Sequence, residues 1–166
     1  GRFETNKVPL RYVSCPRYPA IIRGVKRIDA AGGIVVDASG KRVLLLLKKD
    51  GKRERWVLPK GKRRLVERRR RAARREVLEE TGLARVEVGA YLGRECYFDR
   101  VGRNLVFKEV SYYLMRVAKG KTRLDVCKDE GFVKGRWTSF DMAIRLTSPV
   151  RAHGAIRKAR TAVRNG

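Results

Sequence analysis

The chain has 166 residues, with 42 Lys and Arg against 17 Asp and Glu, and therefore a net charge of +25 at pH 7. This length fits one domain with a usable core. No run approaches the roughly eighteen apolar residues of a membrane span, and the first ten residues lack the apolar segment of a secretory signal. We therefore expect a soluble intracellular protein, cytoplasmic or organellar with a mitochondrial location included, and neither secreted nor membrane-bound. The oligomeric state is left open.

The positive charge favours a polyanionic partner, either a phosphate-rich small molecule or RNA contacted through the basic surface. The basic residues are spread along the chain instead of forming one run. A general bias toward Arg in the source proteome would produce the same composition, so the charge by itself does not identify RNA. Cys15, Cys96 and Cys127 are odd in number and far apart, which favours reduced thiols over a disulfide framework or a zinc site.

The first half of the chain predicts an extension followed by strands. Residues 1–28 contain three prolines and many basic residues, which indicates a basic N-terminal extension before a domain spanning 29–166. Apolar residues at 31–36 and 43–47 predict two buried strands joined by a turn. A polar loop is expected at 48–55, followed by a short strand.

The second half alternates strands and helices. Long strands are predicted at 86–98 and 105–117, with a hairpin connection between them. Helices are expected at 139–145 and 149–162, and the second of these opens with proline. Strands before, between and after helices indicate an α/β layered domain.

Residues 61–83, GKRRLVERRRRAARREVLEETGL, carry the chemistry of the chain. If residues 67–80 are helical, offsets of three and four place Glu76, Glu79 and Glu80 on one side of the helix. Three crowded carboxylates repel one another unless a cation neutralises them, and ligands that offer only oxygen suit Mg²⁺ or Mn²⁺. Arg75 can reach Glu79 one turn later and hold its orientation. Arg71 lies four residues after Glu67 and can pair with it.

The ends of this helix differ in how well the sequence defines them. Between Lys62 and Glu67 there is no Ser, Thr, Asp, Asn or Gly that could cap the start of the helix. Gly82 is the expected stop, because glycine takes positive φ without a steric penalty.

The order of residues in 61–83 resembles the signature of the Nudix hydrolases at its fixed positions: Gly61, Glu67, Arg75-Glu76, Glu79-Glu80 and Thr81-Gly82, with apolar residues between and after them. The resemblance extends over about 29–162 and implies an α/β/α sandwich with a mixed β-sheet between helices. It also implies a metal-dependent pyrophosphohydrolase that uses Mg²⁺ or Mn²⁺.

The resemblance further implies roles for individual residues. Glu79 and Glu80 are the first choices as direct metal ligands, and Glu76 is either a further ligand or the general base. Glu67 is expected to bind a second metal, and Gly61 to offer its backbone carbonyl. Arg75 is expected to orient the glutamates. Relatives often carry an acidic residue shortly before a late strand that ends in Trp, and Glu130 is the best match here.

Other residues are candidates for binding substrate. Lys60, in the segment WVLPKGK ahead of the motif, is expected to contact a phosphate, as are the neighbouring Arg63 and Arg64. Lys108 alternates with apolar residues, and relatives place a phosphate-binding residue near this position. Its alternative role is a structural ion pair. Tyr97 and Tyr112 are candidates for stacking on a base, although aromatic residues in strands more often belong to the core.

Three functions remain compatible with the sequence. The leading prediction is a hydrolase of a phosphoanhydride linkage in a phosphate-rich small molecule, such as a dinucleoside polyphosphate or a diphosphoinositol polyphosphate. The second is a pyrophosphohydrolase acting on the 5′ end of triphosphorylated RNA, which the charge favours. The third is an RNA-binding Nudix module in a larger assembly, and the complete set of glutamates argues against it.

Overall fold

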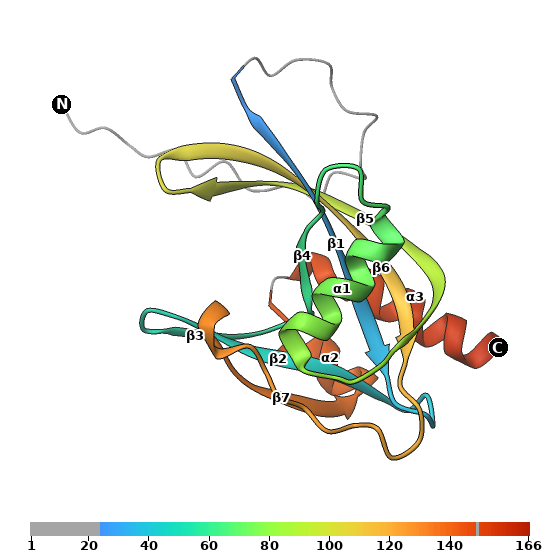
Figure 1. Ribbon diagram of the computed structural model, residues 1–166. Helices are drawn as coiled ribbons and strands as arrows, with labels where there is room; N and C mark the ends of the chain where they lie inside the picture. Colours follow the sequence, from blue (N-terminus) through green and yellow to red (C-terminus); the bar gives the residue numbers. More distant parts are fainter. Residues whose placement is uncertain (1–23, 149) are drawn as a thin grey trace.

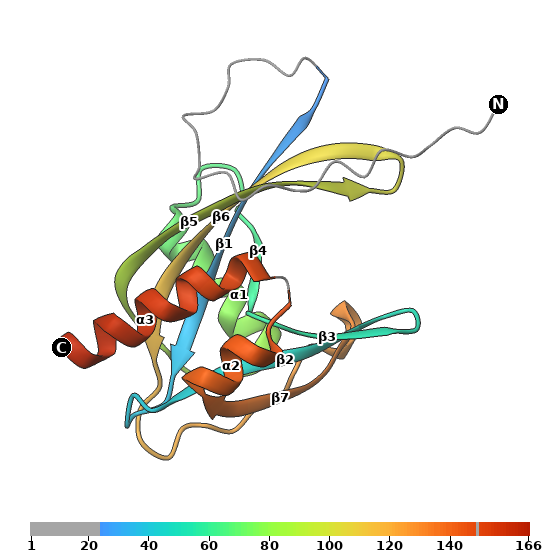
Figure 2. The ribbon, with the colours of Figure 1, turned by 180° about the vertical axis from the view of Figure 1, so that it is seen from behind.

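Three layers make up the protein in the computed structural model, which describes residues 24–148 and 150–166. A mixed β-sheet lies between helix α1 on one face and helices α2 and α3 on the other (Figures 1 and 2). This arrangement confirms the predicted α/β/α sandwich. No described helix is long and apolar enough to cross a membrane.

The strands and helices, in chain order, are β1 (Lys26–Val36), β2 (Arg42–Asp50), β3 (Arg53–Val57), β4 (Lys60–Lys62), α1 (Arg69–Thr81), β5 (Glu87–Val101), β6 (Asn104–Arg116), the 3₁₀ turn η1 (Lys128–Glu130), β7 (Phe132–Ser139), α2 (Phe140–Leu146), the 3₁₀ turn η2 (Val150–Ala152) and α3 (His153–Asn165).

The sheet runs in the order β3-β2-β1-β6-β5, with β4 paired to β1 and β7 paired to β2. β1 and β6 are parallel, from Lys26 opposite Val106 to Val36 opposite Arg116. The other pairs are antiparallel. β1 lies in the middle of the sheet and also pairs with β4, the strand that contains Gly61 at the start of the glutamate motif.

Two hydrophobic clusters hold the layers together, and β1 contributes to both because its side chains alternate between the faces of the sheet. Ala30 and Ile34 pack toward α2 and α3. Ala31 and Val35 pack toward α1, where they meet Ala73 and Val77. The short apolar stripe of α1 is thereby fixed on the sheet, and so is the position of the glutamates on the same helix.

Several boundaries differ from the predictions. The region 48–55 is not a loop, because β2 and β3 form a hairpin whose turn lies between Asp50 and Arg53. The strand β1 starts at Lys26, within the expected extension 1–28, of which residues 1–23 lie outside the described part. Cys96 is disulfide-bonded, contrary to the expected reduced thiol, whereas Cys127 is free.

Candidate active site

Helix α1 begins later than predicted and ends where predicted. It starts at Arg69 with Arg68 as the N-cap, and no side chain caps it. Glu67 therefore lies in the preceding loop instead of on the helix. Gly82 ends the helix with φ 68°, and its amide donates to the carbonyl of Leu78. This positive φ is the conformation for which glycine was expected.

Two glutamates of α1 are buried against the segment that contains β4. The backbone amide of Lys60 donates to Glu80 Oε2 at 3.0 Å. Glu76 lies directly over Gly61, where an added Cβ would come within 2.1 Å of Glu76 Oε2. Glycine at position 61 thus leaves the space that the Glu76 carboxylate occupies, which is a structural reason for the glycine at this place in the motif.

Arg75 holds the acidic cluster together. Its guanidinium donates to Glu67 through two nitrogens, to Glu76 Oε1 at 2.6 Å and to Glu79 Oε2 at 3.1 Å. A further bond reaches the carbonyl of Lys62 at 3.0 Å. The predicted contact between Arg75 and Glu79 is present. These bonds employ all the N–H groups that an arginine side chain offers.

The glutamates have opposite electrostatic environments. Hydrogen bonds from Arg75 lower the pKa of Glu67 to about 2. Burial raises the pKa of Glu80 to about 8, and repulsion from Glu130 and Glu76 contributes to the rise. Burial likewise raises the pKa of Glu76. Glu80 and Glu76 are therefore carboxylates whose negative charge the protein alone does not fully compensate.

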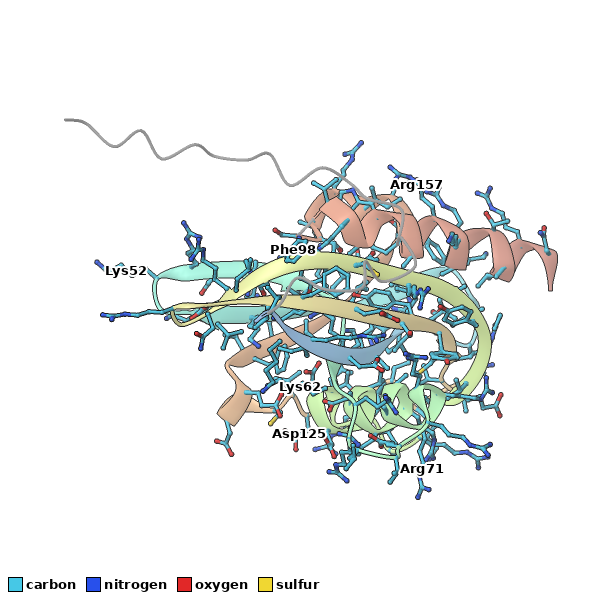
Figure 3. All side chains as sticks on the ribbon, turned by 90° about the horizontal axis from the view of Figure 1, so that it is seen from above. Lys52, Lys62, Arg71, Phe98, Asp125 and Arg157 are labelled. Atoms are coloured by element: carbon cyan, nitrogen blue, oxygen red, sulfur yellow. The ribbon has the colours of Figure 1, made fainter. Side chains whose placement is uncertain are left out.

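The turn η1 brings Glu130 to the same cluster. The segment before it is hydrogen-bonded to the end of α1, with the Asp125 amide donating to Thr81 O at 2.9 Å and the Cys127 amide to Glu80 O at 3.0 Å. Asp125 accordingly lies beside α1 (Figure 3). Glu130 is exposed, and its charge acts on both Glu76 and Glu80.

The donor set fits a hard divalent cation. Its side-chain atoms are carboxylate oxygens, and the raised pKa values of Glu76 and Glu80 indicate an unmet need for positive charge. Within residues 24–148 and 150–166, no three Cys, His, Asp or Glu side chains converge in metal-ligand geometry. Arg75 accounts for the lack of convergence, because its hydrogen bonds hold carboxylate oxygens of Glu67, Glu76 and Glu79 toward its own guanidinium group. A cation at this site would compete with Arg75 for them.

A pocket of about 160 Å³ adjoins this cluster. Glu80 and Lys60 line one part of it, and Tyr97, Lys108 and Tyr112 line another. Lys108 Nζ also contacts Asp99 Oδ2 at 2.7 Å. The lysine thus takes part in the ion pair named as its alternative role and lines the pocket as well. Tyr112 is almost fully buried, so only a small part of its ring is available to a ligand.

The model of the Nudix domain matches residues 26–158. The chain belongs to the Nudix hydrolase family. A candidate mutator protein of Mycobacterium tuberculosis, MutT4, is 42% identical over 98 residues, which is 55% of this chain and 39% of that protein. The chain therefore matches well under half the length of this curated relative.

Solved Nudix structures share the fold. An Ap4A hydrolase binary complex from C. elegans superposes with a TM-score of 0.68 at 21% identity, covering 84% of this chain and 99% of that one. A MutT protein from Methanosarcina mazei Go1 gives a TM-score of 0.61 at 19% identity, covering 83% and 96%. At such identities the similarity establishes the architecture alone.

In this Nudix domain, the arginines of the motif have different surroundings. Arg63 donates to Asp29 at 2.9 Å and to the carbonyl of Glu67 at 2.8 Å, so it fixes the loop that carries Glu67. Arg64 is exposed and lies 3.7 Å from Glu79. Arg71 was expected to pair with Glu67, but Arg75 makes that contact and Arg71 projects away from the sheet (Figure 3).

Glu95 and Arg151 are among the pocket residues that sequence reasoning did not identify. The side chain of Glu95 points from β5 toward the same cavity as Glu80, and Arg151 reaches it from η2. Neither residue belongs to a motif. One signal was available, since Glu95 is an acid within a predicted strand, two residues before Tyr97.

Proposed function

We propose that this Nudix domain hydrolyses a phosphoanhydride linkage in a nucleotide-like, phosphate-rich substrate, with Mg²⁺ or Mn²⁺ as cofactor. One observation carries the proposal: Glu80 of the acidic cluster lines the same pocket as Lys60, Lys108 and Arg151. Carboxylates suited to a divalent cation thus adjoin basic groups suited to phosphates. A chain of phosphates can contact both at once.

The acidic and basic residues have different roles in this proposal. Glu76, Glu79 and Glu80, with Glu67 and the carbonyl of Gly61, would hold the cation. When bound, such an ion offsets the negative charge of the phosphates and increases the acidity of water. Lys60 and Lys108 neutralise phosphate oxygens that lie farther along the pocket.

We infer that Glu130 acts as the general base. In the reaction a water oxygen attacks phosphorus, its proton passes to the Glu130 carboxylate, and the P–O–P bond breaks with the leaving phosphate taking the electron pair. Glu76 is the other candidate for this role, but Arg75 already occupies one of its oxygens.

The proposal is tested by assaying products from several substrates side by side. Purified protein would be incubated with a dinucleoside polyphosphate, a diphosphoinositol polyphosphate and triphosphorylated RNA, each with Mg²⁺, Mn²⁺ or EDTA. We expect release of phosphate-containing products with either metal and none in EDTA. Turnover in EDTA at the rate seen with Mg²⁺ would contradict the metal-dependent mechanism.

Hydrolysis at the 5′ end of RNA is the second candidate function. It is supported by the net charge of +25 and by the exposed arginines Arg68, Arg71 and Arg74 at the start of α1 and along it. Exposed arginines at these positions could bind the phosphates of a chain that extends beyond the pocket.

A further inference from the structure

Glu95 is a half-buried residue whose carboxylate the catalytic mechanism does not use. It lies on β5, opposite Val110 of β6, and lines the same pocket as Glu80. Its Oε1 atom is inaccessible to solvent and has no hydrogen-bond partner among the described residues. A buried acceptor without a donor is costly, and a ligand that supplies one would recover that free energy.

The neighbours of Glu95 form a flat wall. Tyr97 follows two residues later and so faces the same side of the sheet. The guanidinium carbon of Arg151 lies 3.5 Å from the centre of the Tyr97 ring, in a stacked arrangement. Planar aromatic and guanidinium groups are surfaces on which nucleobases stack. An acceptor and a flat wall therefore occur side by side in the pocket.

We propose that Glu95 determines substrate specificity by accepting hydrogen bonds from the edge of a nucleobase that carries adjacent N–H donors, with the base packed against Arg151 and Tyr97. This inference deepens the proposed function, on which it rests. A carboxylate has two acceptor oxygens, and the ring N–H and amino group of guanine offer two adjacent donors that match them. The phosphates of the same nucleotide would extend toward Lys60 and Glu80.

The electrostatics of Glu95 agree with a donor as the missing partner. Burial raises its pKa to about 7, although Arg151, Lys60 and Lys158 oppose that rise. The nearby cations thus offset only part of the rise in pKa that burial causes. Hydrogen bonds from a ligand would stabilise the ionised carboxylate further.

The same carboxylate disfavours a different class of substrate. In a diphosphoinositol polyphosphate the ring hydroxyls carry phosphates, which are anionic and offer no N–H donor. An ionised Glu95 would weaken the attraction that Arg151, Lys60 and Lys158 exert on a phosphate in this part of the pocket, and this opposition contributes to specificity. Among the small molecules considered, the pocket therefore favours nucleotides.

The test measures binding without hydrolysis. Calorimetric titrations in EDTA would compare GMP with IMP, which lacks the amino group, on the wild-type protein, Glu95→Gln, Glu95→Ala and the control Glu87→Gln, an exposed residue on the same strand. We expect the wild type and the control to bind GMP on the order of tenfold more tightly than IMP, because one hydrogen bond to a charged acceptor is lost with IMP. Both Glu95 variants should reduce this ratio toward one.

A second titration uses inositol hexakisphosphate as the polyanion, and Glu95→Gln should bind it several-fold more tightly than the wild type. A wild-type ratio of GMP to IMP affinity near one, or a ratio that survives both Glu95 substitutions, would overturn the proposal. Equal affinity of the wild type and Glu95→Gln for inositol hexakisphosphate would overturn the exclusion of polyphosphorylated rings. Because GMP and IMP contain no phosphoanhydride, base recognition can succeed in this test even if the hydrolase assay fails.

Discussion

Arg75 binds Glu67 through two parallel hydrogen bonds, from Nε to Oε1 and from Nη2 to Oε2, each 2.9 Å long. Because α1 starts only at Arg69, this contact joins the helix to the loop before it. Two-pronged arginine–carboxylate pairs of this kind are stronger and more directional than a simple ion pair. The contact therefore holds the loop before α1 in place, at a helix start that no side chain caps.

Replacing Arg75 with Lys should loosen this loop while keeping the charge. A lysine cannot reproduce the parallel pair of bonds or the contacts to Glu76 and Glu79. We expect the free energy of unfolding to fall by about 1–3 kcal/mol, measured by urea denaturation without metal. Arg74→Lys, at an exposed neighbouring position, serves as the control and should unfold like the wild type. A matching loss in both variants would contradict a special role for Arg75.

Glu80→Gln should abolish hydrolysis and leave the fold intact. The amide oxygen of Gln can still accept from the Lys60 amide, and a neutral side chain avoids the cost of charge at this buried site. The expected stability of the metal-free variant is thus equal to or higher than that of the wild type. Glu79→Gln should also lose activity. Circular dichroism and product assays check both outcomes, and a Glu80→Gln variant with wild-type turnover would refute the assigned metal site.

Glu130→Gln should slow turnover with unchanged metal affinity, whereas Glu76→Gln should lower both. Glu130 is exposed at the edge of the cluster, and loss of a general base typically costs on the order of 10² or more in rate. Glu76 lies over Gly61 inside the cluster. Saturating-substrate kinetics and titration with Mn²⁺ separate the two effects. If Glu130→Gln has the wild-type kcat, the base lies elsewhere.

Glu95 should make stability depend on pH. Burial raises its pKa in the folded protein to about 7 from the ordinary value of 4.5, so the folded state holds the proton more tightly than the unfolded state. Stability from this group is therefore fully present below about pH 4.5 and is lost as pH rises to about 7. The loss should amount to about 3 kcal/mol, and Glu95→Gln should remove it. Urea denaturation at a series of pH values tests this slope.

The exposed arginines of α1 provide the test for RNA. Arg63 and Arg69 both pair with Asp29, so replacing them would also disturb the fold. Arg68, Arg71 and Arg74 are exposed and can be changed to Ala more safely. If RNA binds this face, the salt dependence of binding to single-stranded RNA should become shallower by roughly one unit of slope per lost phosphate contact. Equal slopes for the wild type and the triple variant would leave compositional bias as the explanation of the charge.

The sequence predicted those parts of the site whose spacing is fixed by local geometry. The glutamates of α1, the contact of Arg75 with Glu79 and the glycine at the helix end all follow from helical periodicity and from φ at one residue. The pairing of Glu67 with Arg71 was wrong because it assumed that Glu67 lies on the helix. Without a capping side chain, nothing local marks the start at Arg69.

The sequence did not predict features that depend on contacts between distant segments. The region 48–55 contains mostly charged residues, so the edge hairpin of β2 and β3 showed no apolar alternation and resembled a loop. Glu95 is an isolated acid in a strand, and only the packing of η2 against β5 places Arg151 beside Tyr97. Pairing of β1 with β6 joins residues far apart in the chain, which periodicity cannot reveal.

That parallel pairing has a consequence for how the protein folds. Lys26 lies opposite Val106 and Val36 lies opposite Arg116, while β2 pairs with β7 near the other end of the chain. Each contact closes a long loop before any favourable energy is gained, and such topologies fold slowly. During synthesis on the ribosome, β1 can pair with β2 and β4 as soon as they emerge, but its edge toward β6 stays open until residues 104–116 are made. The vulnerable period of this molecule is thus its own biosynthesis, when that edge of the central strand can pair with other chains.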